Sequence, residues 1–325
     1  MKTMADARYS TGILGYLERI YAEQRRDFSC QAENSNQFEI WQTRSRPRLR
    51  ELIGLDAIAG SMGDHRVSVE LGESQRVEAY TRQKGIIATE PDVKIPFWLL
   101  RPSGEGPHPL GIFPHGHGDY AMDSYAGIVE EGELAERNRR EDREVAVQAV
   151  RRGFVAIAPN TRGFKPADIP DLTGRHGNRN CRSQLIHCLL AGRTPVGERV
   201  WDMMRIIDWA TSQPFVDPEK ILMMGNSGGG VVTIYSSAID TRISVAVPSC
   251  SFCTYVGLNG IVHHCDCNAI PGILSFGGIH DVAGLIAPRH LCIVNGGEDK
   301  LFPNDEVDRA VRGLKEIYAV AGVPD

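Results

Sequence analysis

A single serine stands in a glycine-rich turn, Gly225-Asn-Ser-Gly-Gly229. The apolar residues 221–224 before it predict a short buried strand, and residues 231–235 after it can begin a helix. In this context a G-x-S-x-G turn projects the serine hydroxyl, and the helix start directs free N–H groups toward it. We therefore predict that Ser227 is a nucleophile and that the N–H of Gly228 belongs to an oxyanion hole. The alternative is a glycine-rich loop that only caps a strand.

A loop of alternating histidine and glycine, residues 115–118, follows the apolar run 110–113. After such a strand, a loop of this kind can turn a backbone N–H toward a neighbouring nucleophile. We predict that the N–H of His117 completes the oxyanion hole and that its imidazole has no catalytic role. His115 is a candidate for the pocket wall. The alternatives are simple hydrogen bonding within the loop and metal ligation by the two histidines, although no convergent acidic cluster accompanies them.

Two further loops follow apolar runs and carry charged residues. Arg162 is a second candidate for the pocket wall, with a purely structural ion pair as the alternative. Asp299 follows the run 291–294 and comes later in the chain than Ser227, as the acid does in a Ser–Asp–His order. Such a carboxylate would hold an imidazole in the right tautomer and stabilise its protonated form. Glu298 is the competing acid, and helix capping by both acids is the alternative.

A group of cysteines and histidines lies between residues 250 and 268. Its members are Cys250, Cys253, His263, His264, Cys265 and Cys267. Cysteine pairs beside histidines suggest zinc, but a C-x-C pair is closer than the usual C-x₂₋₄-C spacing. We therefore predict packing or pocket-lining roles, with His263 and His264 as candidate pocket residues and no bound metal. A metal site and a redox disulfide stay open as alternatives.

The composition is that of an ordinary globular protein of 325 residues, 42% hydrophobic and 24% charged, with a net charge of -5. This charge gives no indication of a nucleic-acid partner. No apolar run is long enough for a membrane helix, and the first residues lack the apolar core of a secretory signal. We expect a cytoplasmic protein without a cofactor, whose eight cysteines are mostly reduced. Its oligomeric state stays open.

The hydrophobic pattern predicts the framework that must position these loops. Residues 1–65 are expected to form a helical extension. From residue 66 the period changes to two, and the segments 66–71 and 77–82 alternate as half-buried antiparallel strands do.

Continuous apolar runs then follow, and such runs are typical of parallel strands buried on both faces. They are residues 110–113, 154–158, 221–224, 244–247 and 291–294. Helical patterns lie between them at residues 141–152 and 199–211. The alternation predicts an α/β domain over residues 66–325, built on a doubly wound, mainly parallel sheet. The functional loops should then meet at the carboxyl ends of the strands.

Several motifs in chain order resemble a known group. They are Ile95–Pro102, His115–Gly118, Arg199–Asp202 with Asp208-Trp209, Phe215–Ile221, Gly225–Gly229, His264–Asn268 with Pro271-Gly272, and Ile286–Arg289. Together they resemble the α/β-hydrolase superfamily, and in particular the dienelactone-hydrolase-like bacterial esterases of the acetylxylan-esterase type. The resemblance implies Ser227 as nucleophile, Asp299 as triad acid and a small-molecule ester as substrate, with acetylated sugars as the suggested class.

One departure from this family stands out. Its catalytic histidine follows the acid, after one further helix and strand, whereas all ten histidines of this chain precede Asp299. Residues 304–321 fit the expected helix, and the sequence stops about where the last strand should begin. We therefore expect the 325-residue chain to be weakly active on esters, as a hydrolase fold without its final strand and histidine.

Three other interpretations stay open. The chain is a non-catalytic binding protein on a hydrolase scaffold, or a hydrolase that uses an upstream histidine, with His263, His264 and His280 as candidates. The third is a metal-dependent hydrolase that uses His115, His117 and the cysteine loop.

Overall fold

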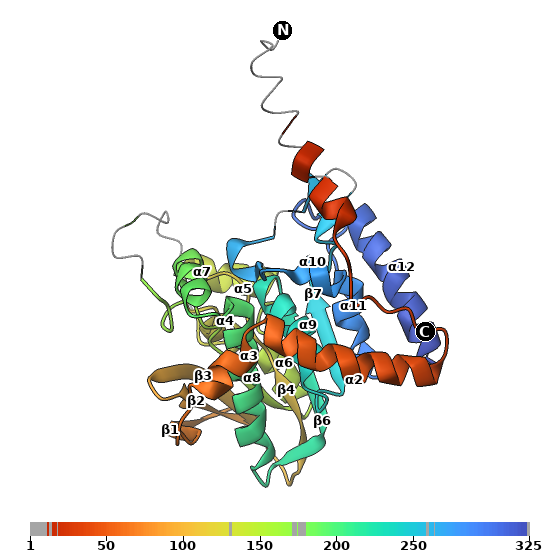
Figure 1. Ribbon diagram of the computed structural model, residues 1–325. Helices are drawn as coiled ribbons and strands as arrows, with labels where there is room; N and C mark the ends of the chain where they lie inside the picture. Colours follow the sequence, from red (N-terminus) through yellow and green to blue (C-terminus); the bar gives the residue numbers. More distant parts are fainter. Residues whose placement is uncertain are drawn as a thin grey trace.

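The centre of the protein is an eight-stranded mixed sheet with the order β1-β2-β3-β5-β4-β6-β7-β10 (Figure 1). The computed structural model describes residues 12, 15–17, 19–129, 132–170, 174, 180–257, 260–262 and 264–323. The strands of the sheet are β1 (Ser68–Val77), β2 (Tyr80–Glu90), β3 (Val93–Pro102), β4 (His108–Ile112), β5 (Val155–Pro159), β6 (Val216–Asn226), β7 (Val245–Ser249) and β10 (His290–Leu291). A separate small sheet pairs β8 (Val256–Gly257) with β9 (Gly260–Ile261).

The pairing confirms the predicted fold class. Strands β1, β2, β3 and β5 pair antiparallel in succession, whereas β5, β4, β6, β7 and β10 pair parallel. The antiparallel part is the region of alternating hydrophobicity, and the parallel part contains the continuous apolar runs. The carboxyl ends of β4, β6 and β7 therefore lie at one edge of the sheet.

Helices cover both faces of the parallel strands. They are α2 (Ser35–Leu52), α3 (Leu55–Gly60), α4 (Ala121–Tyr125), α5 (Gly132–Arg140), α6 (Val145–Arg151), α7 (Asn180–Leu190), α8 (Pro195–Thr211), α9 (Gly228–Ile239), α10 (Ile273–Phe276), α11 (Ile279–Gly284) and α12 (Asn304–Val320), with a 3₁₀ turn η1 (Asp266–Asn268). Strand β5 shows why its sequence lacks alternation. Val155 and Ile157 pack in the core shared with α8, and Ala156 and Ala158 pack in the core shared with α6. Both faces exclude water, so every position is apolar.

Two local predictions were wrong at their boundaries. The segment predicted as one strand over 77–82 contains a hairpin turn: β1 ends at Val77, Glu78 has φ 50°, and β2 begins at Tyr80, so residues 80–82 are in a strand as predicted. The alternation of side chains continues through this two-residue turn, so hydrophobic periodicity alone does not reveal it. The helix predicted over 141–152 begins only at Val145.

The segment predicted as a helical extension shares the main core. Residues 15–17 and 19–23 are helical, and α2 and α3 follow them. Phe38 and Leu49 of α2 belong to the same buried cluster as Ile234 of α9. Helices α2, α9, α11 and α12 are neighbours in this cluster (Figure 1). In the described part of the chain, no helix combines the length and apolar character that crossing a bilayer requires.

Candidate active site

Ser227 occupies a strained backbone position between the end of β6 and the start of α9. Its φ is 55° and its ψ is -119°, a region that side chains with a Cβ rarely adopt. Such a conformation costs about 1–3 kcal/mol and persists only where the surroundings hold it. Here the N–H of Ser227 donates to the carbonyl of Ser249 at the end of β7, over 2.8 Å. The hydroxyl is partly exposed and, within the described residues, has no hydrogen-bond partner.

The two glycines that frame the serine are required by close packing. A Cβ on Gly229 would lie 2.0 Å from the carbonyl oxygen of Pro114. A Cβ on Gly225 would lie 2.4 Å from the carbonyl of Gly229. Real Cβ atoms do not approach other atoms so closely, so the G-x-S-x-G pattern reflects the approach of the loop after β4 to the turn.

The histidine-glycine loop lies directly against this turn. A Cβ on Gly116 would be 2.7 Å from the carbonyl oxygen of Asn226 and 3.1 Å from Cβ of Ser227. The ring of His117 approaches Gly228, with Nδ1 3.4 Å from where a Cβ on that glycine would stand. Among the described residues, the N–H groups of His117 and Gly228 have no protein acceptor. The structure therefore brings together the residues predicted for the oxyanion hole.

His115 is held inside the protein and does not line the adjacent cavity described below. Its side chain is 0% exposed. Nε2 accepts the N–H of Thr161 at 3.0 Å, and the hydroxyl of Thr161 donates to the carbonyl of His115 at 2.8 Å. Burial lowers the pKa of His115 to about 4, so the ring is neutral and can accept this bond. The imidazole therefore ties the loop after β4 to the loop after β5.

Arg162 is also buried, within an ion network. Its Nε donates to Asp202 at 2.9 Å, and its Nη1 lies 2.5 Å from Glu90. Arg193 reaches the second oxygen of Glu90 at 2.8 Å. This arrangement corresponds to the structural alternative for Arg162, and the residue is not part of the adjacent cavity wall.

Asp299 lies in the turn beyond β10. Its Oδ1 accepts the N–H groups of Leu301 and Phe302 at 2.8 and 3.1 Å. Within the described residues, Oδ2 has no partner. The turn begins near Val294, which bridges to Ser249, the residue that accepts the N–H of Ser227. The predicted nucleophile and the predicted acid therefore follow β6 and β10, the two strands that flank β7, at the same edge of the sheet.

The histidines considered as upstream bases are placed differently from one another. The ring of His264 packs against Phe302 of the acid turn, with centroids 5.2 Å apart, and burial lowers its pKa. His280 lies on α11, 3.5 Å from Asp281. His263 lies outside the described residues. No described imidazole hydrogen-bonds the hydroxyl of Ser227 or the carboxylate of Asp299.

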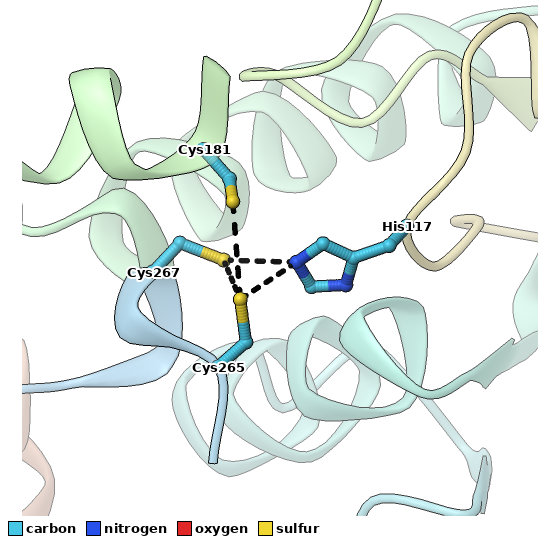
Figure 2. A group of neighbouring side chains, drawn as sticks. All are labelled: His117, Cys181, Cys265 and Cys267. Atoms are coloured by element: carbon cyan, nitrogen blue, oxygen red, sulfur yellow. Dashed lines mark hydrogen bonds between the residues drawn. The ribbon is translucent and has the colours of Figure 1, made fainter. Parts of the chain in front are cut away.

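Four side chains, His117, Cys181, Cys265 and Cys267, form a cluster (Figure 2). It adjoins the serine turn through the ring of His117, which approaches Gly228. His117 comes from the loop after β4, Cys181 from the first turn of α7, and the other two cysteines from η1 and its N-cap. No role was predicted for Cys181, because it stands more than eighty positions from the other cysteines of the cluster and no local motif surrounds it. Hydrogen bonds to Cys265 and Cys267 raise the pKa of His117 to about 9.

A cavity of about 550 Å³ opens beside this cluster. His117, Phe164, Cys181 and Cys265 line it, and Ser227 is not among the lining residues. The ring of His117 stands against that of Phe164, with centroids 4.8 Å apart.

Comparison with known proteins bears on the fold and on the segment around the serine turn. Residues 136–260, which include the serine turn, match the acetyl xylan esterase family model. Over these residues the chain is similar to the acetyl xylan esterases. The solved structures share its fold, and both findings agree with the carboxylic ester hydrolase predicted from the sequence motifs.

Individual relatives are distant. The protein YtaP of Bacillus subtilis (strain 168), which carries the provisional name of a hydrolase, is 25% identical over 277 residues, 82% of this chain and 87% of YtaP. A crystal structure provisionally described as an acetyl xylan esterase from Bacteroides fragilis superposes with a TM-score of 0.75 at 19% identity. The superposition covers 96% of this chain and 80% of the Bacteroides fragilis chain. A glucuronoyl esterase from Solibacter usitatus has a TM-score of 0.61 at 16% identity, covering 91% and 84%.

Proposed function

We propose that Ser227 is the nucleophile of a carboxylic ester hydrolase that works through an acyl-enzyme. The observation that carries this proposal is the strained serine between two N–H groups, those of His117 and Gly228, that have no acceptor among the residues the structure describes. Strained backbone conformations concentrate at functional sites. Glycine would adopt this conformation at lower cost, so the presence of serine suggests that its hydroxyl is needed. Free N–H groups beside it suit the negative charge that develops on an ester carbonyl under attack.

The proposed reaction has two steps. The oxygen of Ser227 bonds to the carbonyl carbon, the carbon–oxygen bond to the alcohol breaks, and the alcohol leaves with a proton. Water then attacks the acyl-serine, releases the carboxylic acid and returns the proton to the serine. Each step needs a group that takes up and gives back a proton. Oδ2 of Asp299, which has no partner among the described residues, is suited to orient an imidazole for this task.

Among the described residues, no imidazole is placed to accept the proton of Ser227. Because no described imidazole reaches Ser227, its hydroxyl stays protonated and reacts slowly. Oxyanion and binding contributions alone leave roughly 10³-fold acceleration over water. We therefore propose that this 325-residue chain hydrolyses esters only weakly.

The substrate class is proposed from the relatives. Acetyl xylan esterases and a glucuronoyl esterase share the fold, and both names refer to esters of sugars. We propose a small carbohydrate ester, with acetylated sugars first.

Hydrolysis of p-nitrophenyl acetate and of an acetylated xylo-oligosaccharide tests this proposal. We expect slow turnover with a covalent acyl group on Ser227, detected by mass spectrometry, that is absent in Ser227→Ala and unchanged in Ser74→Ala, an exposed control on β1. An acyl-enzyme that still forms in Ser227→Ala would contradict the proposal. Fast turnover lost in both Ser227→Ala and His264→Ala would instead favour the rewired site.

A further inference from the structure

The four-residue cluster beside the active site has the composition of a soft metal site. Three thiols and one imidazole converge from three separate segments, and their ligand atoms all lie within 4.8 Å of one another. Cys3His is one of the ligand sets that bind structural zinc. Two of the four residues, Cys181 and Cys267, are buried at their positions in the fold.

Three of the distances between the ligand atoms match edges of a tetrahedron around zinc, and all six lie within 4.8 Å. With Zn–S near 2.3 Å and Zn–N near 2.0 Å, the edges should be about 3.8 Å between sulfurs and about 3.5 Å between sulfur and nitrogen. The measured values are 3.8 Å for Cys181–Cys265, 3.7 Å for Cys265–Cys267 and 3.5 Å for Cys267 to Nε2 of His117. One edge, from Cys265 to His117, is shorter at 2.9 Å. A disulfide does not fit, because bonded sulfurs are about 2.05 Å apart.

The charge around the cluster also suits a metal. Three thiolates and a neutral imidazole around Zn²⁺ leave one negative charge. Arg199 is 1% exposed, and its Nη1 lies 3.2 Å from the sulfur of Cys267. Among the described residues, Arg199 has no carboxylate partner within ion-pair distance, and its other donors reach the carbonyl of Arg162 and the amide of Gln184. A buried guanidinium without a carboxylate needs another anion, which the thiolates of the metal site would supply.

The local structure explains why the C-x-C spacing does not prevent such a site. Cys265 is the N-cap of η1 and Cys267 lies within it, so the tight 3₁₀ turn places both sulfurs on one side. The remaining ligands come from distant segments, so no second knuckle is needed. The sequence-based argument against metal considered only the local spacing.

We propose that His117, Cys181, Cys265 and Cys267 bind one Zn²⁺ ion with four protein ligands. A site closed by four protein ligands is structural, because no position remains for water or substrate. The ion would crosslink the loop after β4, the first turn of α7 and the segment around η1. Each thiol that binds releases its proton to solvent.

Metal analysis of the full-length purified protein tests the proposal directly. We expect one zinc per chain after dialysis against buffer with trace zinc. Replacing zinc with Co²⁺ should give thiolate-to-cobalt charge-transfer bands and the intense visible bands of a tetrahedral site. These spectra do not depend on activity, and Ser227→Ala should give the same zinc content and spectrum. Failure of the esterase proposal would therefore leave this result unaffected.

Variants locate the site. Cys181→Ser and Cys265→Ser should each lower zinc affinity by at least tenfold, measured by competition with a chromogenic chelator. Cys292→Ser, at an exposed cysteine outside the cluster, should not change it. Cys181→Ser is the more discriminating variant, because the spacing of cysteines in the sequence does not predict that Cys181 is a ligand. If a variant does not fold, the Co²⁺ spectrum of the native chain serves as the test instead.

Three results would overturn the proposal. The first is native protein that contains no zinc and takes up neither Zn²⁺ nor Co²⁺ at micromolar concentrations. The second is zinc content that stays unchanged in both Cys181→Ser and Cys265→Ser. The third is a native mass two hydrogens lower than the reduced chain, with a disulfide mapped between two of the three cysteines.

Discussion

The loop at residues 115–118 contacts two regions that are built in opposite ways. Toward the serine turn the contact is made by the backbone: Gly116 packs on Asn226 and Ser227, and two N–H groups have no acceptor in the described part of the chain. Toward the cysteine cluster it is a side chain, the imidazole of His117, that makes the contact. The first region is local in sequence apart from this loop, whereas the second joins residues up to 150 positions apart. Close packing of backbones is visible in the sequence as a pattern of glycines. The convergence of side chains from distant segments produces no such local sequence pattern.

The serine turn should be the less tolerant of the two regions. Gly229→Ala places a Cβ 2.0 Å from the carbonyl of Pro114. We expect a loss of about 3 kcal/mol in the free energy of unfolding, measured by urea denaturation, because two backbones must separate. Gly60→Ala, where a Cβ would meet nothing within 4 Å, is the matched control and should be nearly neutral. Equal effects of the two substitutions would contradict the close packing described here.

The cysteine cluster should stabilise the fold only while metal is bound. With zinc at 100 times its dissociation constant, the bound ion contributes about 2.7 kcal/mol. Cys265→Ser should lose most of this amount, and a chelator should bring the native protein down to the level of the variant. Thermal unfolding with and without chelator measures both effects. If the chelator destabilises Cys265→Ser as strongly as the native chain, the cluster is not the metal site that stabilises the fold.

The smallest expected effect is a gain in the free energy of unfolding, opposite to the losses expected above. Ser227→Gly removes the strained Cβ, and we expect a gain of about 1 kcal/mol in the free energy of unfolding. Ser74→Gly, at an exposed position within β1, should instead lose a few tenths to about 1 kcal/mol, because glycine weakens a strand. A loss of stability in Ser227→Gly would mean that the turn is not strained, and the contrast between the two regions would lose its basis.

The sequence predicted much of the fold and one half of the site. Buried runs such as 154–158 and the turn around Ser227 follow from local hydrophobicity and glycine placement, and both were found as predicted. His115 and Arg162 were placed in the right loops, but their burial depends on partners, Thr161 and Asp202, that become neighbours only when strands pair.

The cysteine cluster shows where such prediction ends. Cys181 stands in α7 with no motif around it, and its approach to Cys265 is set by how α7 packs on η1. Spacing rules for metal sites describe ligands that share a local knuckle. They carry no information about ligands brought together by tertiary packing.

Labelling with a fluorophosphonate probe, followed by peptide mapping, tests the central claim most directly. The account predicts an adduct confined to the peptide that contains Ser227, absent after Ser227→Ala and after denaturation, and formed more slowly than in a hydrolase with a complete triad. An adduct on another residue, or no adduct under conditions that label such a hydrolase completely, would contradict the claim that this turn presents a reactive hydroxyl to an oxyanion hole.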